Sequence, residues 1–136
     1  MSLRNKNIDS CACGREKLYT NCCGLIHKNI SLAITAEDLM RSRYTAFVKA
    51  NINYLQKSHH STTRPTDKEA GQIKTWAESV SWLKLEIVET TNGLLRDTSG
   101  TVTFKAYFLE NGRMDIIHEN SFFEKENGLW MYKNAL

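Results

Sequence analysis

The sequence lacks any long apolar segment. No run approaches the roughly 18 residues that a membrane-spanning helix requires, and the polar start MSLRNKNIDS lacks the apolar stretch of a secretory signal. We therefore expect a cytoplasmic protein with no membrane partner. The 136 residues contain no internal repeat and a single proline, Pro65. This length allows one domain with a single hydrophobic core and a small appended module.

A strong charge of one sign is also missing, because the net charge is only +3. The charge is unevenly distributed. Residues 1–28 contain five basic and two acidic side chains and so carry the whole excess, while the rest of the chain is neutral. The basic residues are Arg4, Lys6, Arg15, Lys17 and Lys28.

No catalytic arrangement of nucleophile, histidine and carboxylate can be built from residue spacing. His60 and His118 could carry protons, because imidazole titrates near neutral pH. Neither stands beside an evident nucleophile, and such histidines are more often surface or hydrogen-bonded structural residues. We therefore expect a protein that is not an enzyme.

Cysteine is absent from the chain except for one cluster. Cys11, Cys13, Cys22 and Cys23 all lie within CACGREKLYTNCCG, with the spacing C-x-C-x8-C-C. In a reducing compartment a tight cluster indicates a metal site before it indicates disulfides. Zinc favours four tetrahedral sulfur or nitrogen ligands at about 2.0 to 2.3 Å. The sequence therefore predicts one structural Zn²⁺, without which this short segment would be disordered.

Two alternatives to four thiolate ligands remain open. In an oxidising compartment, Cys11 could pair with Cys22 and Cys13 with Cys23 in two disulfides. His27 is close enough in the sequence to replace Cys23 as the fourth ligand.

The cysteine segment resembles the SEC-C motif, the small zinc module found at the C-terminus of the SecA translocation ATPase. The matching residues are Cys11, Cys13, Gly14, Tyr19, Cys22 and Cys23. Arg15 and Glu16 stand where the motif usually has Ser-Gly. The resemblance implies a zinc-binding module that docks to other proteins.

Beyond Gly24 the sequence predicts two helices. Thr35 and Asp38 are typical of a helix start, and apolar residues recur with helical spacing from about Ala36 to Lys57: Leu39, Met40, Tyr44, Phe47, Val48 and Leu55. A second capping box, Thr66 with Glu69, follows the lone proline and predicts a shorter helix that ends near Ser79.

From Trp82 onward the pattern alternates as in β-strands. Leu83, Leu85 and Ile87 alternate with Lys84 and Glu86, and a similar alternation runs from Val102 to Phe108. Three Asn-Gly pairs, at 92–93, 111–112 and 127–128, are typical of hairpin turns. Helices followed by an antiparallel meander predict an α+β fold in which the helices cover one face of the sheet.

The whole chain resembles the YchJ family of small bacterial proteins, which joins a SEC-C motif to an NTF2-like domain. The resemblance depends on the cysteines, on TAEDLMRSRYTAF, on His60 with Thr63 and Arg64, and on HENSFF. It implies a SEC-C module over residues 1–28 and an NTF2-like domain over residues 29–136. An NTF2-like domain is a cone in which a curved antiparallel sheet wraps around helices, often enclosing a cavity.

One helical residue is a polar anomaly. Arg43 falls within the apolar face formed by Leu39, Met40 and Phe47. A buried guanidinium needs a carboxylate or several carbonyl groups. Glu119 shares a strand face with Ile117, Ser121 and Phe123, and we therefore expect an ion pair between Arg43 and Glu119 in the cone. The candidate cavity residues are Arg43, Glu119, His60, Tyr44 and Trp76.

Two classes of function follow from these residues. In the first, the protein is an adaptor whose basic zinc module docks to a protein partner, such as a chaperone, translocation or ribosome-associated protein. Nucleic acid is a further candidate partner, with phosphate contacts from Arg4, Lys6, Arg15 and Lys17, but only Tyr19 offers a ring for stacking. In the second, the cavity binds a small molecule or catalyses a reaction.

Overall fold

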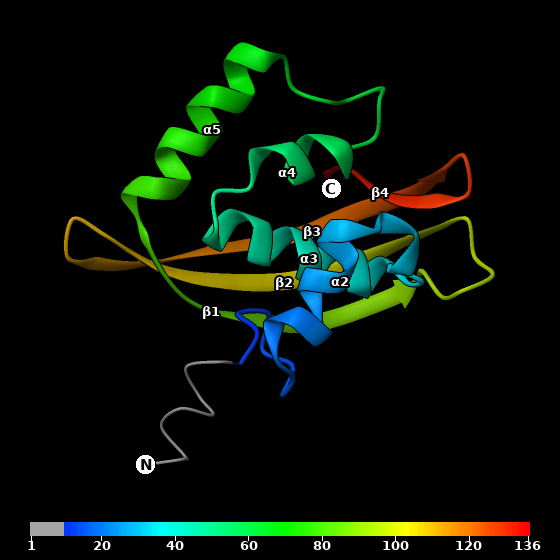
Figure 1. Ribbon diagram of the computed structural model, residues 1–136, viewed down its shortest axis with the longest axis horizontal. Helices are drawn as coiled ribbons and strands as arrows, with labels where there is room; N and C mark the ends of the chain where they lie inside the picture. The colour runs from blue at the N-terminus through cyan, green and yellow to red at the C-terminus, as the bar shows by residue number, and fades with distance from the viewer. Residues whose placement is uncertain (1–9) are drawn as a thin grey trace.

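The computed structural model describes residues 10–136 and consists of helices packed on one curved sheet (Figure 1). The N-terminal segment contains a 3₁₀ turn (Tyr19–Asn21), the short helix α2 (Cys23–Lys28) and a second 3₁₀ turn (Ile30–Leu32). Three helices follow: α3 (Ala36–Val48), α4 (Ile52–Lys57) and α5 (Asp67–Ser79). The strands are β1 (Ser81–Asn92), β2 (Ser99–Glu110), β3 (Arg113–Glu126) and β4 (Leu129–Ala135). No helix within residues 10–136 is long and apolar enough to cross a membrane.

Helix α3 begins where the sequence predicts it. The hydroxyl of Thr35 accepts a hydrogen bond from the backbone N–H of Asp38 at 3.0 Å and satisfies one of the free donors of the first turn. The prediction of one helix up to Lys57 is wrong, because α3 ends at Val48 and a separate helix, α4, begins at Ile52. Ala50 has a φ of 52°, and its N–H donates to the carbonyl oxygen of Phe47. The N–H of Asn51 donates to the carbonyl oxygen of Ala46, which completes a Schellman motif and ends the helix.

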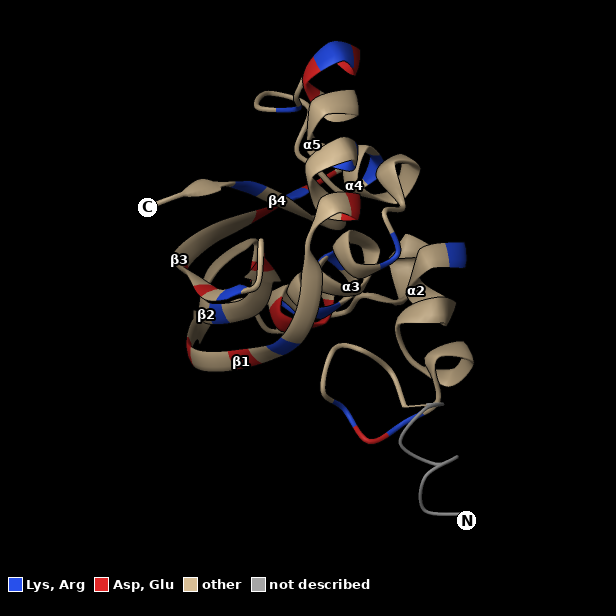
Figure 2. Ribbon diagram, turned by 90° about the vertical axis from the view of Figure 1, so that its left-hand side faces the viewer, with Lys and Arg blue, Asp and Glu red and all other residues tan. Residues whose placement is uncertain are grey.

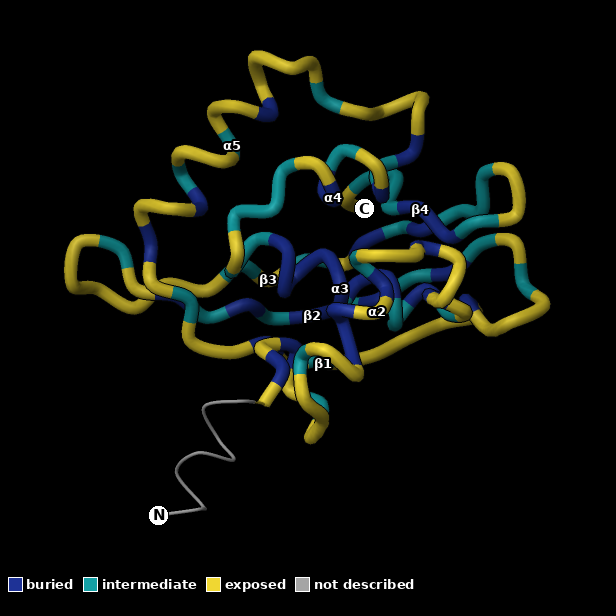
Figure 3. Tube along the Cα trace, viewed as in Figure 1, coloured by how far each residue is buried: buried dark blue, intermediate teal, exposed yellow. Residues whose placement is uncertain are grey.

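Helix α5 confirms the second predicted helix. Thr66 and Glu69 exchange side chain to backbone hydrogen bonds in a full capping box, directly after Pro65. Only Ala70 and Ala77 of this helix are buried, and Figure 3 shows α5 at the margin of the molecule.

The sheet is an antiparallel meander in the order β1-β2-β3-β4, as the sequence predicts. Asn111-Gly112 and Asn127-Gly128 form tight two-residue turns in which both residues have positive φ, as hairpins of this type require. Asn92 and Gly93 also have positive φ, but they open a longer connection that continues to Ser99. The α+β class with an antiparallel sheet is therefore confirmed.

Strand β1 departs from simple alternation. Its pairing with β2 shifts between Trp82 and Lys84 and again between Ile87 and Glu89. The residues at these bulges, Leu83 and Val88, are exposed, whereas Trp82 faces the helices together with Leu85. The expectation that Leu83 lies on the same face as Leu85 is wrong. Bulges bend a strand and increase its twist, and these two curve the sheet around α3 (Figure 2).

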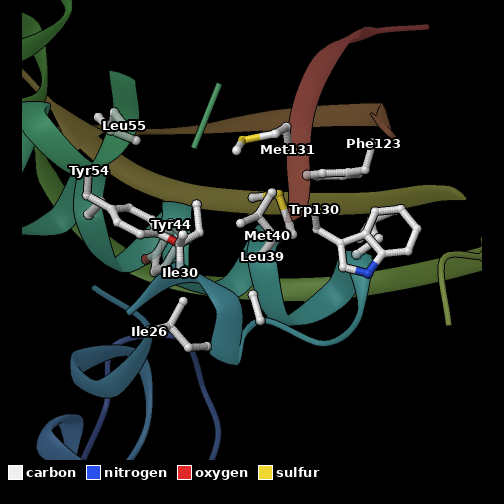
Figure 4. Close-up of a cluster of buried hydrophobic side chains, with 14 of the residues drawn as sticks. Ile26, Ile30, Leu39, Met40, Tyr44, Tyr54, Leu55, Phe123, Trp130 and Met131 are labelled. Carbon is white, nitrogen blue, oxygen red and sulfur yellow. The ribbon is translucent and has the colours of Figure 1, made fainter. Parts of the chain in front are cut away.

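The core lies between α3 and the sheet. Its most deeply buried large side chains are Leu39 of α3, Phe123 of β3 and Trp130 of β4 (Figure 4). Ile26 and Ile30 of the N-terminal segment belong to the same cluster. The cysteine module is therefore held against the domain by side-chain packing, in addition to the chain that connects the two.

Candidate metal centre and cavity

The four cysteines converge on one point. The Sγ atoms of Cys11, Cys13, Cys22 and Cys23 all lie within 4.8 Å of one another, and all four side chains are buried. Cys13 and Cys22 bring their sulfur atoms to 3.6 Å. Four sulfurs at about 2.3 Å from a tetrahedral Zn²⁺ would lie about 3.8 Å apart, so the donor set fits a metal ion of this size.

A glycine turn presents the first pair of cysteines. Gly14 has a φ of 95°, and its N–H donates to the carbonyl oxygen of Cys11 at 3.3 Å. The N–H of Cys11 donates to the carbonyl oxygen of Lys17 and closes the turn. Arg15 and Glu16 are not among the residues with positive φ, so their replacement of Ser-Gly leaves the turn intact.

Burial and hydrogen bonds among the four thiols shift pKa values within the cluster in opposite directions. Hydrogen bonds with Cys13 and Cys23 lower the pKa of the Cys11 thiol, and hydrogen bonds with Cys11 and Cys13 raise the pKa of the Cys23 thiol. Burial raises the pKa of the Cys22 thiol to about 11. Thiols this close cannot all ionise unless a cation offsets the repulsion. The chemistry of the cluster therefore fits a divalent metal ion.

The alternatives for these cysteines find no support in the described residues. All four thiols are free. His27 lies outside the cluster, because its Nδ1 is 2.8 Å from the hydroxyl of Tyr19 and its Nε2 is 2.8 Å from the carbonyl oxygen of Ser42. Nδ1 is thus used within the module and Nε2 fastens the module to α3, while Tyr54 packs on the ring.

Helix α3 supports the cluster with polar side chains. Nη1 of Arg41 donates to the carbonyl oxygen of Cys13 at 2.6 Å, and the hydroxyl of Thr45 donates to Sγ of Cys23 at 3.4 Å. Arg15 forms an ion pair with Asp38 at 2.8 Å. This basic residue, expected to face a partner, is instead engaged with the helix.

The predicted cavity exists between the helices and the sheet and has a volume of about 300 Å³. Arg43, Tyr44, Trp76 and Glu119 line it, as the sequence analysis places them. His60 is not among the lining residues, whereas its neighbour His59 is.

His60 is buried elsewhere. Its Nδ1 is within hydrogen-bond distance of the hydroxyl of Thr62, and its Nε2 lies 3.4 Å from Glu124. His118 is exposed on the outer face of β3. Burial and the nearby Arg43 and Arg64 lower the pKa of His59 to about 4, so the histidine at the cavity is neutral at neutral pH.

Arg43 and Glu119 do not form the expected ion pair. Nη1 of Arg43 donates to the carbonyl oxygen of Leu55 and to the hydroxyl of Ser58, both at 2.8 Å. Its guanidinium carbon lies 4.7 Å from the centre of the Tyr132 ring. The hydroxyl of that tyrosine donates to Glu119 at 3.0 Å, so the side chain of Tyr132 lies between Arg43 and Glu119 and contacts both.

Sequence reasoning missed Tyr132 and His59. The strand β4 is short, and Trp130 and Met131 are both buried, so alternation does not indicate which face Tyr132 occupies. His59 faces the cavity because a backbone bridge pairs it with Tyr132. That pairing is a tertiary contact with no signal in the sequence.

A curved four-stranded meander covered by helices, with a four-cysteine cluster packed on its first long helix, defines an NTF2-like domain that carries a cysteine module with the donor set of a metal site. The family model described as the YchJ middle NTF2-like domain matches residues 35–135. The chain belongs to this YchJ family, whose relatives below also carry the family designation UPF0225. The predicted boundary between residues 28 and 29 stays a prediction.

Relatives cover nearly the whole chain. A UPF0225 protein of Streptomyces coelicolor is 42% identical over 127 residues, which are 92% of this chain and 93% of that protein. A UPF0225 protein of Vibrio parahaemolyticus is 39% identical over 125 residues, which are 90% of this chain and 72% of that protein.

Two solved structures are also similar. The solution structure of a SEC-C motif containing protein from Rhodopseudomonas palustris matches with a TM-score of 0.82 and 29% identity, and covers 93% of this chain and 97% of that one. The crystal structure of a SEC-C motif containing protein from Psychrobacter arcticus matches with a TM-score of 0.78 and 30% identity, and covers 96% of this chain and 83% of that one.

Proposed function

We propose that this protein is a cytoplasmic zinc-binding adaptor that docks to a protein partner through its cysteine module and catalyses no reaction. The observation that carries the metal site is the convergence of four buried sulfur atoms within 4.8 Å. Thiolate ligands in a tetrahedral set favour zinc over harder cations such as Mg²⁺ or Ca²⁺. A reducing compartment keeps the thiols available for the metal.

The residues around the cluster suit a structural ion. When bound, zinc supplies a cross-link between the turn at Cys11–Cys13 and the start of α2. Four thiolates and Zn²⁺ carry a formal charge of −2, and the guanidinium group of Arg41, which donates to the carbonyl oxygen of Cys13, offsets part of it. The ion would thus stabilise the module against the domain rather than react with a substrate.

Exposed side chains of the module support docking to a protein. Leu18 and Leu25 of the module are exposed, and so are its basic residues Lys17 and Lys28. A mixture of apolar and basic side chains suits a protein surface. The module is less suited to nucleic acid, because Tyr19 is not free to stack on a base. Nζ of Lys49 lies 4.1 Å from the centre of its ring, and His27 binds its hydroxyl. Arg4 and Lys6 lie outside the described residues.

Elemental analysis of native protein tests the metal site. We expect one zinc per chain and four thiols that resist alkylation until a chelator is added. Absence of a stoichiometric metal, with all four thiols freely reactive, would contradict the proposal.

Affinity capture from a bacterial lysate tests the docking. The variant Leu18→Asp with Leu25→Asp changes the exposed surface and keeps the four cysteines. The matched control is Leu94→Asp with Leu95→Asp, two exposed leucines of the β1–β2 connection. We expect a partner that the wild type and the control retain and that the module variant loses. Equal capture by all three proteins would contradict docking through this surface, and RNA capture that falls steeply with salt would favour nucleic acid.

A second candidate function is the binding of a small molecule in the cavity, either for storage or for a reaction. The observation that favours it is that the aromatic side chains on the wall leave about 300 Å³ open, a volume at the lower end of known ligand sites. Native mass spectrometry of gently purified protein would show a bound molecule as an added mass that disappears after unfolding.

A further inference from the structure

The cavity contains a cation whose hydrogen-bond donors are only partly used. Arg43 is 6% exposed, and it lines the cavity from α3. All of its hydrogen bonds come from Nη1, which donates to Leu55 and Ser58. Nε and Nη2 donate to no group among residues 10–136. These two nitrogens form the side of a guanidinium that binds a carboxylate with two parallel hydrogen bonds.

The unused nitrogens are open to the cavity. Among the described residues, no fully buried side-chain nitrogen or oxygen lacks a hydrogen-bond partner, so the unpartnered nitrogens of Arg43 retain accessible surface. Since Arg43 lines the cavity and is otherwise enclosed, that surface faces the cavity. The ring of Tyr132 covers one face of the guanidinium and leaves its edge free.

The charge of Arg43 is not neutralised by a contact. Burial lowers the pKa of Arg43 to about 10, so the side chain is still charged at neutral pH. Glu119 is the carboxylate of the cavity, but Oε2 of Glu119 is bound by the hydroxyls of Ser121 at 2.5 Å and Tyr132 at 3.0 Å. A buried guanidinium without a counter-ion is unfavourable, which is a reason to expect an external anion.

The aromatic residues that line the rest of the cavity favour a ligand with a flat apolar part. Trp76 and Trp82 meet edge to face with ring centres 5.5 Å apart, and Tyr44, Phe47 and Phe104 extend this aromatic wall. A flat apolar group packs well against such a surface. The polar end of the ligand would then lie at Arg43, and the apolar body against the tryptophans.

We infer that the cavity binds a small monocarboxylic acid with an aromatic body, its carboxylate on Nε and Nη2 of Arg43. This inference rests on the proposal that the cavity holds a small molecule. A phosphate fits less well, because a dianion would find one guanidinium, a neutral His59 and the negative charge of Glu119 in the same cavity.

Calorimetry on the full-length, zinc-loaded protein tests this choice. Four acids serve as ligands, namely benzoate, phenylacetate, 3-phenylpropanoate and indole-3-acetate, each beside its neutral amide. The amide has the shape of the acid and lacks its charge. We expect at least one acid to bind on the order of tenfold more tightly than its amide, because charge-assisted hydrogen bonds are about twice as strong as neutral ones.

Two variants locate the contact. Arg43→Met removes the cation, and we expect it to abolish the preference for acid over amide. Glu119→Gln removes the repelling charge and leaves Arg43 in place, so it should strengthen binding of the acid and leave binding of the amide unchanged. If Arg43→Met does not fold, the comparison of acid with amide and the Glu119 variant still decide the question.

The outcomes separate this inference from the function on which it rests. Acids and amides that bind equally well would overturn the carboxylate inference and leave a ligand cavity. If none of the eight compounds binds, the carboxylate inference is overturned, and native mass spectrometry of the purified protein decides separately whether the cavity holds another molecule. The zinc site is unaffected by either result, because it is measured by metal content.

Discussion

Nη1 of Arg41 donates a hydrogen bond of 2.6 Å to the backbone carbonyl oxygen of Cys13. Two residues further along the same helix, Arg43 lines the cavity. Helix α3 therefore contacts the Cys11–Gly14 turn with one side and the cavity with another. Its position relative to the sheet affects both sites.

The variant Arg41→Met should loosen the Cys11–Gly14 turn. It keeps the aliphatic part of the side chain but removes the hydrogen bond to Cys13 and the ion pair with Glu37. We expect the free energy of unfolding to fall by about 1.5 to 3 kcal/mol, as for other hydrogen bonds to charged groups, and zinc to be released faster to a chelator.

The matched control for this variant is Lys28→Met. Lys28 is an exposed basic residue of the same module, so the control removes the same charge without removing the contact at Cys13. Zinc release that is equally fast in both variants would show that charge, rather than the hydrogen bond, governs retention of the metal.

The variant Ala50→Gly should stabilise the protein. Ala50 occupies the left-handed position that ends α3, with a φ of 52°. An L-residue other than glycine is strained there by about 1 to 2 kcal/mol, and part of the gain is lost because glycine has more freedom in the unfolded chain. We expect the free energy of unfolding, measured by urea denaturation, to rise by about 1 kcal/mol. Ala46→Gly, inside the same helix, should lower it, and a decrease in both would contradict the strain argument.

Two glycine substitutions should have opposite effects. Gly71 is exposed in α5 with open space around an added Cβ, so Gly71→Ala should raise the free energy of unfolding by about 1 kcal/mol. An added Cβ at Gly100 would lie 2.4 Å from the backbone nitrogen of Gly93. Gly100→Ala should therefore destabilise the β1–β2 hairpin, and thermal melting of the two variants compares them directly. A Gly100 variant as stable as the wild type would mean that the hairpin shifts without cost.

His59 should make stability depend on pH. The pKa of its side chain is about 4 in the folded protein and close to 6.5 when unfolded. Between these values the unfolded chain binds a proton that the folded protein does not, so the contribution of His59 is present above pH 6.5 and is lost as the pH falls towards 4. Urea denaturation at several pH values would show this loss.

The variant His59→Gln serves as the reference for that experiment. It cannot take up the proton, so the difference in free energy of unfolding between wild type and variant should shrink from pH 7 to pH 5. Other groups titrate equally in both proteins and cancel. A difference that does not change with pH would contradict the lowered pKa of His59.

Local signals in the sequence predicted a large part of this structure. Thr66 with Glu69 marked the start of α5, because a capping box is formed by residues three positions apart. Asn111-Gly112 and Asn127-Gly128 marked two hairpins, because these residues tolerate positive φ. The spacing of the cysteines indicated a metal site, and the four sulfur atoms do converge.

Other features depend on contacts between distant segments. Ala50 ends α3 without the glycine that usually signals such an end. The bulges at Leu83 and Val88 arise from pairing with β2 and reverse the face on which Leu83 lies. The burial of Arg43 was predicted, but its hydrogen-bond partners come from α4 and the residue that follows it.

The sequence by itself determined the starts of α3 and α5, the two tight hairpins, the α+β class and the set of four sulfur donors, because these depend on residues within about a dozen positions of one another. Only the tertiary structure decided that Tyr132 separates Arg43 from Glu119 and that His59, rather than His60, faces the cavity. The physical reason is that the face on which a strand residue lies depends on strand register and bulges. Register is set by the packing of the whole domain.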